Sequence, residues 1–415
     1  MNRLTELGKR AKAASRTLSC ASTAQKNAAL AAIADALCAH IPEILAANEE
    51  DLKDAAQNGM SESLQDRLRL TAARIEGIAG AVRDLICLPD PVGQVIDGGT
   101  RPNGLKIEKV RTPIGVVGMI FEARPNVTVD AACLCLKSSN VCILRGGKEA
   151  IHSNTALAQI MCGALGGAGL PHDCILLVTD TSRDSANDLM NLNGYLDVLI
   201  PRGGKGLIRA VVENATVPVI ETGAGNCHIF VDASADLTQA VAICDNAKTS
   251  RPSVCNAVET VLVHSRIADQ FLPALAEKLA EHQVELRGCA RTRAILPQAA
   301  PASDEDYATE FDDYILALRV VDSLDEAIEH IRTYTTGHSE AILTNHFANA
   351  QRFTAEIDAA AVYVNASTRF TDGGEFGFGA EIGISTQKLH ARGPMGLAEL
   401  TSCKYIVTGS GQIRT

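Results

Sequence analysis

From Pro113 onward, short apolar runs alternate with segments of helical periodicity, and this alternation constrains the fold more than any other feature of the chain. Strand–helix alternation is typical of parallel sheets that are covered by helices on both faces. Ligands of such sheets bind beyond the carboxyl ends of the strands. The sequence therefore predicts an α/β fold, with strands at 115–121, 140–144, 174–180, 195–200 and 217–221, then at 259–264, 314–321, 339–344 and 360–365.

The regions outside this alternation have patterns of their own. Residues 1–90 carry Ala and Leu at helical spacing, which predicts helices. Asn103 and Gly104 form a strong tight-turn signal within alternating apolar residues, and we expect a hairpin at 97–112. One more strand is expected at 404–408, with little chain left to cover it. Because an uncovered strand edge is a liability unless another subunit pairs with it, we expect a homo-oligomer.

Composition narrows the class of protein. A chain of 415 residues that is 46% apolar can form two or three domains. The net charge of −11 argues against a nucleic-acid-binding surface. No apolar run is long enough to span a membrane, and the basic amino terminus has the spacing of an amphipathic helix rather than of a transit peptide. The 13 cysteines are scattered without a C-x-x-C pair, so we expect neither a metal site nor disulfides, and a cytoplasmic location.

The four letters RGGK follow two of the predicted strands, at 145–148 and at 202–205. Glycines let the backbone approach a ligand closely, amides at a helix start bind anions, and the lysine adds positive charge. Neither loop has the G-x-G-x-x-G or Walker A spacing, and a solvated turn is the alternative interpretation. The recurrence favours phosphate contacts to a dinucleotide.

Cys255 differs from the other cysteines because it lies in a polar turn, SRPSVCNA, with Arg251 upstream and Asn256 next to it. By contrast, Cys133 and Cys142 lie in apolar runs typical of inert thiols. A reactive thiol needs local amides or positive charge to ionise near neutral pH. We therefore interpret Cys255 as a candidate nucleophile, with an inert buried thiol as the alternative.

Four segments, in this order along the chain, resemble the aldehyde dehydrogenase superfamily. They are TPIGVVGMIFEARPN, VPVIETGAGNCHIFVD, SRPSVCNAVETVLVH and the glycine-rich FTDGGEFGFGAEIGIST. The spacing of Glu221 and Cys255 is similar to that of the superfamily's acidic residue and nucleophile. Within the superfamily, EARPN, the RGGK loops, ETGAGN and VDSLDEAIEHIRTYTTGHSEAI resemble one branch, from about residue 5 to 410.

This resemblance implies an enzyme of proline biosynthesis that reduces L-glutamyl 5-phosphate with NADPH to L-glutamate 5-semialdehyde and phosphate. It implies a Rossmann-like NADPH-binding domain at 1–96 and 113–250 and an α/β catalytic domain at 251–395. It also implies a small β oligomerisation element at 97–112 and 396–415. A further expectation is a contact with glutamate 5-kinase, because the acyl phosphate that this kinase makes is labile.

The resemblance also implies roles for single residues in catalysis. Cys255 forms a thioester that hydride then converts to the aldehyde, and its backbone N–H helps to bind the oxyanion. Residue type favours Asn126 as the second oxyanion donor and Arg124 as a partner of the substrate's phosphate or carboxylate, whereas counting from Gly118 puts Arg124 at the oxyanion position. Glu221 occupies the place of the superfamily's general base. A reductase gains nothing from hydrolysis, so a substrate-binding, cofactor-guarding or structural role is open for Glu221.

The remaining implied roles concern binding. Positive charge at Arg145 and Lys148 suits a 2′-phosphate, which favours NADPH over NADH. Gly203, Gly204 and Lys205 are assigned to the pyrophosphate, and Glu310 lies near the superfamily's second ribose contact. His338, Ser339 and Glu340 are placed near the substrate or a domain interface, with a capped turn as the alternative.

Two other functions remain open on the sequence. One is an NAD(P)-dependent dehydrogenase of another semialdehyde, which would need no phosphate for the oxidative reaction. The other is a dinucleotide-binding scaffold without catalysis, in which Cys255 would react no faster than the other cysteines.

Overall fold

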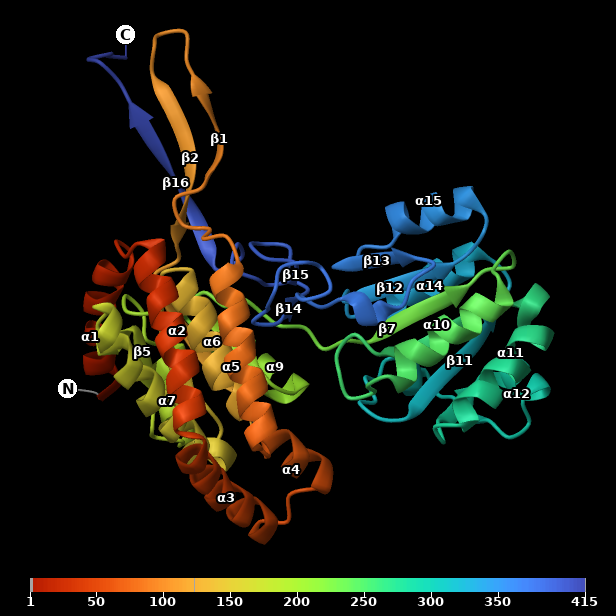
Figure 1. The fold of residues 1–415 in the computed structure, drawn as a ribbon. Helices are drawn as coiled ribbons and strands as arrows, with labels where there is room; N and C mark the ends of the chain where they lie inside the picture. The colour runs from red at the N-terminus through yellow and green to blue at the C-terminus, as the bar shows by residue number, and fades with distance from the viewer. Residues whose placement is uncertain (1–2, 123, 415) are drawn as a thin grey trace. The chain divides into compact units, whose positions relative to one another are not determined.

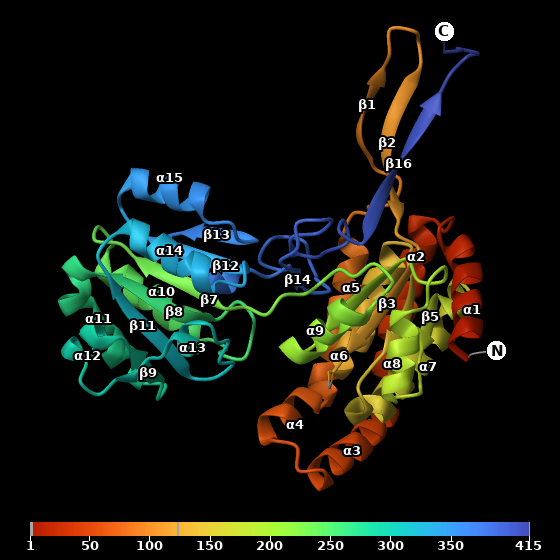
Figure 2. The same cartoon turned by 180° about the vertical axis from the view of Figure 1, so that it is seen from behind.

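The computed structural model describes residues 3–122 and 124–414, which fall into two compact units. Unit 1 comprises Met1–Thr222, Gly377–Gly383 and Met395–Thr415. Unit 2 comprises Gly223–Phe376 and Ile384–Pro394. Figures 1 and 2 show the elements of each unit from opposite sides.

Unit 1 contains a parallel four-stranded sheet with the strand order β5-β4-β3-β6. Its strands are β3 (Val116–Phe121), β4 (Val141–Arg145), β5 (Ile175–Leu177) and β6 (Val198–Arg202). Every residue of β3 is buried, as expected for the central strand of a sheet covered on both faces. The chain runs outward from β3 to β5 and then returns to the other side of β3 with β6. This reversal creates a topological switch point between β3 and β6.

Helices cover both faces of this sheet. The crossover helices α6 (Pro125–Lys137) and α7 (Ile151–Leu165) pack on β4 and β5, and the amino-terminal helices α2 and α5 pack outside them. On the other face, α1 (Arg3–Leu18), α8 (Arg183–Met190) and α9 (Lys205–Asn214) lie together. An ion pair of 2.6 Å between Lys12 and Asp197 fastens α1 to the sheet. The remaining helices are α2 (Thr23–Ala39), α3 (Ile41–Gln57), α4 (Glu62–Leu68), α5 (Ala72–Cys87), η1 (Lys148–Ala150), η2 (Gly166–Ala168) and η3 (His172–Cys174).

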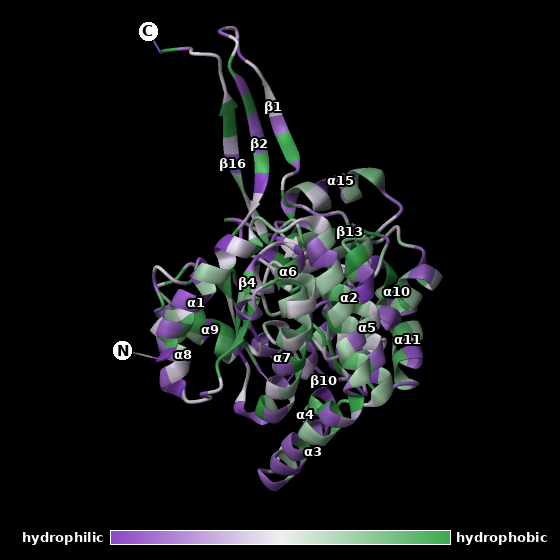
Figure 3. Ribbon diagram, turned by 60° about the vertical axis from the view of Figure 1, so that its left-hand side comes forward, coloured by the Kyte–Doolittle hydropathy of each residue, from purple (hydrophilic) through white to green (hydrophobic). Residues whose placement is uncertain are grey.

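The predicted hairpin and the last predicted strand form one antiparallel sheet, β1-β2-β16. Its strands are β1 (Val95–Thr100), β2 (Lys106–Pro113) and β16 (Thr401–Thr408). Figure 3 shows apolar residues along β1 and β16, and Val95, Tyr405 and Val407 are more than half exposed. The predicted hairpin is confirmed, and its role in oligomerisation stays a prediction.

Unit 2 is built on a parallel seven-stranded sheet with the order β10-β9-β11-β8-β7-β12-β13. All residues of the neighbouring strands β7 and β8 are buried. The strands are β7 (Cys227–Val231), β8 (Val258–His264), β9 (Glu285–Gly288), β10 (Ala300–Pro301), β11 (Ile315–Val321), β12 (Ser339–Leu343) and β13 (Ala361–Val364), and a small hairpin joins β14 (Ile384–Ser385) to β15 (Gly393–Pro394).

Two apolar cores lie on opposite faces of this seven-stranded sheet. The larger core includes Phe271 and packs α10 (Leu237–Thr249) and α11 (Ser265–Ala280) against β7 and β8. The smaller core includes Phe230 and Phe353 and packs α14 (Leu324–Tyr334) and α15 (Phe347–Glu356) against the same strands. The short helices are α12 (Ala290–Ile295), α13 (Asp304–Tyr307) and η4 (Thr368–Phe370).

The segment 217–230 corrects two expectations. The predicted strand at 217–221 is reduced to a single bridge between Val219 and Leu199, because Pro218 has no N–H to donate to a sheet. The buried strand of this region is instead β7, which pairs with β8 and β12 of unit 2. The units therefore divide after Thr222. From the sequence we expected this boundary after residue 250.

Among the described residues, no single helix is both long enough and apolar enough to cross a membrane. Only α2 and α3 taken together meet that criterion, and they are bent by 69° where they meet.

Replacing Phe230 with alanine should lower the free energy of unfolding by about 3–5 kcal/mol, because the ring is fully buried in the smaller core of unit 2. Phe347 is 75% exposed, so Phe347→Ala should change that free energy by less than about 0.5 kcal/mol. Urea unfolding followed by circular dichroism measures both. Equal effects of the two variants would contradict the core assignment.

Candidate active site

The switch point of unit 1 brings together the loops that follow β3 and β6. The loop after β3 contains Glu122 and Arg124, and the loop after β6 contains Gly203 and Gly204. The Gly204 N–H donates to Glu122 Oε2 at 2.9 Å, and the Glu122 N–H donates to the Arg202 carbonyl at 3.2 Å. The sequence places these loops at the carboxyl ends of parallel strands, which is where ligands of such sheets bind.

Gly203 and Gly204 lead directly into α9, which begins at Lys205. A Cβ on Gly203 would lie 2.7 Å from the carboxyl carbon of Glu122, so a larger residue would displace the Glu122 carboxylate. Gly204 and Lys205 are exposed at the amino end of the helix, where backbone N–H groups and the helix dipole favour negative charge. Glu122 supplies a carboxylate to one of these amides.

The other RGGK loop follows β4, the strand next to β3. The Arg145 guanidinium donates from Nη2 to the Thr181 and Ser182 carbonyls at 2.7 and 2.9 Å. Burial lowers its pKa. Its Nε is buried without a hydrogen-bond partner among the described residues, and Lys148 is exposed on η1. The unsatisfied donor and the nearby cation fit a phosphorylated nucleotide.

The predicted catalytic residues divide between the units. Asn126 lies in the first turn of α6, after Arg124 at the N-cap and Pro125 at the first helical position. Asn126 Nδ2 donates to Asp130 Oδ2 at 3.0 Å, and burial raises the pKa of Asp130 to about 6. Glu221 is half-buried at the end of the first chain segment of unit 1. These residues belong to unit 1, whereas Cys255 belongs to unit 2.

Cys255 lies in the loop between the end of α10 at Thr249 and the start of β8 at Val258. This loop is at the amino ends of the parallel strands of unit 2, together with Asn226, which precedes β7. The two RGGK loops of unit 1 follow the carboxyl ends of their strands, whereas Cys255 lies in a polar turn before a strand.

The surroundings of Cys255 separate it from the buried thiols of the chain. Cys255 is half-buried. Burial raises the pKa of the Cys174 thiol to about 12 and raises those of Cys133 and Cys244 further still. These three thiols are therefore protonated at neutral pH and are unsuited to nucleophilic attack. The half-buried Cys289 is the exception, with a pKa below the usual range, since desolvation is outweighed by hydrogen bonds such as that with Thr292.

The ETGAGN segment packs directly against the backbone of Cys255. A Cβ on Gly225 would fall 1.4 Å from the Cys255 carbonyl oxygen, so only glycine fits there. The Cys227 thiol donates to the same oxygen at 3.2 Å. Glu310 accepts the Gly225 N–H at 2.8 Å, which holds the segment from its other side. These contacts hold the backbone of the Cys255 loop against the ETGAGN segment.

The residues His338, Ser339 and Glu340 are fully buried. The structure replaces the capped turn considered above with strand β12, which starts at Ser339. Ser339 Oγ contacts His338 Nδ1 at 2.8 Å and Thr371 Oγ1 at 2.6 Å, and Glu340 accepts the backbone N–H of His228 at 2.8 Å. His338 also lies 3.8 Å from the Cys227 sulfur. These contacts join the three residues to β7 and to Thr371. Their role in substrate binding stays a prediction.

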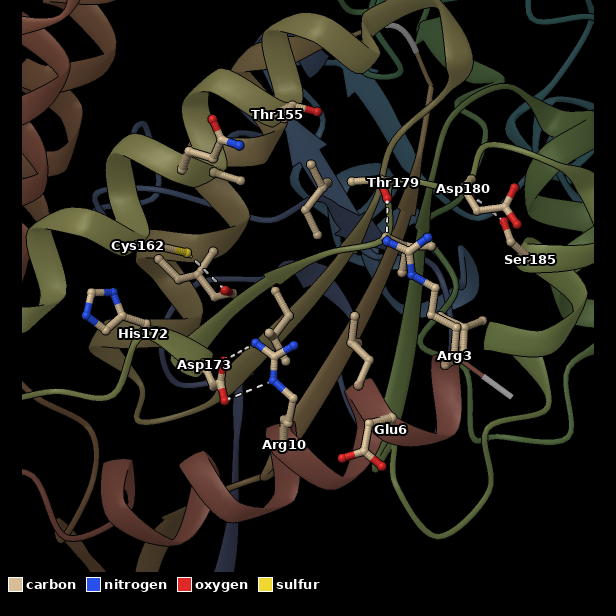
Figure 4. Close-up of a pocket in the computed structure, with 18 of the residues that line it drawn as sticks. Arg3, Glu6, Arg10, Thr155, Cys162, His172, Asp173, Thr179, Asp180 and Ser185 are labelled. Carbon is tan, nitrogen blue, oxygen red and sulfur yellow. Dashed lines mark hydrogen bonds and ion pairs between the residues drawn. The ribbon is translucent and has the colours of Figure 1, made fainter. Parts of the chain in front are cut away.

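A separate pocket of about 480 Å³ lies in unit 1 against β5, lined by α1, α7 and the segment after β5 (Figure 4). Arg10 and Asp173 form an ion pair in it, and the Cys162 thiol donates to the Ile175 carbonyl at 3.1 Å. The sequence did not predict this pocket, and its described lining residues include no predicted site residue. The described residues also contain no cluster of three or more His, Cys, Asp or Glu side chains suited to a metal ion.

Comparison with known proteins identifies the family. A sequence profile of the aldehyde dehydrogenase family matches residues 3–303. A gamma-glutamyl phosphate reductase of Clostridium novyi (strain NT) is 60% identical over 413 residues, covering 100% of this chain and 99% of that protein. Another, of Moorella thermoacetica, is 60% identical over 407 residues and covers 98% of this chain and 97% of that protein. The chain belongs to the aldehyde dehydrogenase family, in its gamma-glutamyl phosphate reductase branch.

Solved structures agree with this assignment. The crystal structure of a gamma-glutamyl phosphate reductase from Thermotoga maritima has a TM-score of 0.98 and 52% identity, and each chain covers 100% of the other. An acetylating aldehyde dehydrogenase from Geobacillus thermoglucosidasius has a TM-score of 0.71 at 18% identity, over 99% of this chain and 97% of that one. The second likeness shows the aldehyde dehydrogenase fold alone.

Several residues near the loops of unit 1 and near the Cys255 loop were not predicted from the sequence. Glu122 lies in EARPN, and its position after β3 could have indicated a place at the switch point. Gly225 lies between Ala224 and Asn226 in ETGAGN, and a glycine at such a position could have indicated a close approach of the backbone. Arg369 lies in a segment without periodicity, and no sequence signal marks it.

Replacing Gly225 with alanine should lower the free energy of unfolding by about 3 kcal/mol or more, because backbone atoms of the Cys255 loop must move to admit the methyl group. The matched control is Gly163→Ala in α7, where the added methyl meets nothing within 4 Å. That variant should gain up to about 1 kcal/mol from helix propensity. Urea unfolding compares the two, and an unchanged stability of Gly225→Ala would exclude the close contact.

Proposed function

We propose that this chain reduces L-glutamyl 5-phosphate to L-glutamate 5-semialdehyde and phosphate with NADPH, as a step of proline biosynthesis. The observation that carries the proposal is the 60% identity, over essentially the full length of both chains, to proteins named gamma-glutamyl phosphate reductase. The half-buried thiol of Cys255, in a polar loop held by the ETGAGN segment, supports it.

The reaction begins at the sulfur of Cys255. The thiolate attacks the carbonyl carbon of the acyl phosphate, so that a C–S bond forms, the bond to the phosphate oxygen breaks and inorganic phosphate leaves. NADPH, when bound, supplies the hydride that reduces the resulting thioester. The C–S bond then breaks, its electron pair returns to the sulfur of Cys255, and the aldehyde is released.

The oxyanion that forms at the carbonyl needs hydrogen-bond donors. We assign this role to the backbone N–H of Cys255 and to Asn126. The Asn126 amide carries two hydrogens, and the hydrogen bond to Asp130 uses one of them. Arg124, at the N-cap of the same helix, is proposed as a partner of a substrate anion. Glu221 is not assigned the role of a hydrolytic base, because the acyl group leaves by reduction rather than by hydrolysis.

The chain's own residues hold the cofactor from unit 1. The exposed amino end of α9, with Gly203, Gly204 and Lys205, suits the pyrophosphate. Arg145 has a buried Nε without a partner among the described residues, and Lys148 adds an exposed positive charge in the same loop. Both cations suit a 2′-phosphate, and we therefore propose NADPH rather than NADH as the hydride donor.

Replacing Cys255 with alanine should abolish phosphate-dependent reduction of NADP by glutamate 5-semialdehyde, since no thioester can form. Cys289→Ala removes another half-buried thiol whose pKa is lowered, and it should keep full activity. Absorbance at the NADPH band measures the rate. Undiminished turnover of Cys255→Ala would contradict the mechanism, and turnover without phosphate would favour a hydrolytic dehydrogenase.

Replacing Lys148 with glutamate should raise KM for NADPH about tenfold, equivalent to about 1.4 kcal/mol, because a carboxylate repels the 2′-phosphate. KM for NADH should change little, since NADH lacks that phosphate. The control is Lys53→Glu, an exposed lysine on α3 with a side chain 63% exposed, which should leave both constants unchanged. Steady-state kinetics with each cofactor tests this. An equal rise for NADPH and NADH would show that Lys148 does not read the 2′-phosphate.

A further inference from the structure

The Arg369 guanidinium lies across the two ends of the Cys255 loop. Its Nε donates to Ser250 Oγ at 3.0 Å, on the side where the loop leaves α10. Its Nη1 donates to the side-chain oxygen of Asn256, the residue after Cys255. The bonded residues stand on both sides of Cys255 in the sequence, so the positive charge of Arg369 is held at the loop that carries Cys255.

The backbone of the segment that carries Arg369 is tied to the same loop. Asn256 Nδ2 donates to the carbonyls of Arg369 and Thr371 at 3.2 and 3.0 Å, and Thr368 Oγ1 donates to the Asn256 carbonyl at 2.7 Å. Asn256 and Thr368 are buried. Arg369 is therefore positioned by a hydrogen-bonded frame rather than by a mobile surface loop.

No carboxylate within residues 3–122 or 124–414 forms an ion pair with Arg369. The donors of Arg369 that have partners bind neutral oxygens, and its Nη2 makes no hydrogen bond in that part of the chain. Arg251 is the neighbour of Ser250, and its exposed side chain likewise has no ion pair with a described residue. Burial and the charge of Arg251 both lower the pKa of Arg369, while the Cys255 thiol and the Asp372 carboxylate act in the opposite direction.

Like charges near one another repel, and an anion that binds to both relieves this repulsion. The nearest other cation on the preceding helix, Lys248, cannot serve as a partner for that anion, because it is buried in an ion pair of 2.6 Å with Glu259. The loop also follows the carboxyl end of α10, where the helix dipole favours cations and gives an anion no support. The arginines are therefore the positive charges available to an anion at this loop.

We propose that Arg369 and Arg251 bind the phosphoryl group of the acyl phosphate, and the inorganic phosphate that it releases, beside Cys255. This assignment rests on the proposed function for the identity of the substrate. Guanidinium groups bind phosphate oxygens through paired N–H donors and keep their charge throughout the reaction. The pair holds the leaving group while the C–O bond breaks, and in the reverse direction it brings phosphate to the thioester.

The test uses the full-length protein and inorganic phosphate as the probe. Iodoacetamide is uncharged, so its rate of alkylation of Cys255, followed by peptide mass spectrometry, reports whether phosphate occupies the loop. Phosphate should slow alkylation in the wild type, with chloride at equal ionic strength as the reference. Arg369→Gln should raise the half-maximal phosphate concentration at least about tenfold, and Arg369→Lys should raise it less.

Matched variants keep the outcome decisive. Arg251→Gln changes an exposed side chain that makes no hydrogen bond with a described residue, so it tests the pair even if Arg369→Gln fails to fold. Arg266→Gln removes an exposed arginine of unit 2 and should leave the phosphate dependence unchanged. Unaltered phosphate protection in both Arg369→Gln and Arg251→Gln would overturn the proposal. So would loss of protection in Arg124→Gln alone, which would place the phosphoryl group at the arginine of the EARPN loop.

A kinetic measurement separates this proposal from the proposed function. With glutamate 5-semialdehyde and NADP, Arg369→Gln should keep the initial burst of NADPH that accompanies thioester formation, while KM for phosphate rises at least about tenfold. If wild-type protein shows protection that depends on Arg369 but no phosphate-dependent turnover, the anion site stands and the proposed function fails. If turnover depends on Cys255 and phosphate but protection does not depend on either arginine, the anion site alone fails.

Discussion

The parallel pairing of β7 with β8 is the constraint on which the nucleophile loop depends. Both strands are fully buried and start at the same edge of the seven-stranded sheet, so the segments that precede them meet. Gly225, just before β7, lies against the carbonyl of Cys255, just before β8. The bulge at Cys227 and His228 falls at this edge. A shift of the register by one residue would reverse the faces of β7 and move its amino end away from Cys255.

In unit 1, the loops of interest follow the carboxyl ends of parallel strands instead of preceding the strands. Its two glycine-containing loops follow β4 and β6, the strands on either side of β3, and the strand order reverses between β3 and β6. Glu122 occupies an amide of that second loop at the start of α9. The carboxylate therefore sits where backbone donors favour negative charge, and it satisfies a donor that would otherwise point to solvent.

Much of the fold was predictable because its main signals are local. The apolar runs of β3, β8 and β11 are long, β-branched and free of proline, and each forms a buried strand close to its expected bounds. The segment 217–221 has the same composition but contains Pro218, and it makes one bridge. The shorter run of β7 was missed, although its pairing with β8 and β12 decides where unit 2 begins.

The site was only partly predictable, because the residues around Cys255 come from distant parts of the chain. The polar turn marks Cys255 itself, and glycines mark the loops of unit 1. The contacts of Arg369 with Ser250 and Asn256 join positions more than a hundred residues apart, and no periodicity or motif encodes such a pairing. The burial of Ser339 and Glu340 likewise depends on the neighbours of β12 in the sheet, β7 and β13.

The pairing of β16 with β2 has a consequence for the order in which the molecule can be assembled. All strands of the four-stranded sheet of unit 1 lie between residues 116 and 202, so a ribosome delivers that sheet before any strand of unit 2. The sheet β1-β2-β16 must wait for residues 401–408, after both larger sheets have been synthesised. Until then β2 keeps one edge open during translation, and the nascent chain depends on the charged residues of that strand, Lys106, Glu108, Lys109 and Arg111, to discourage mispairing with its neighbours.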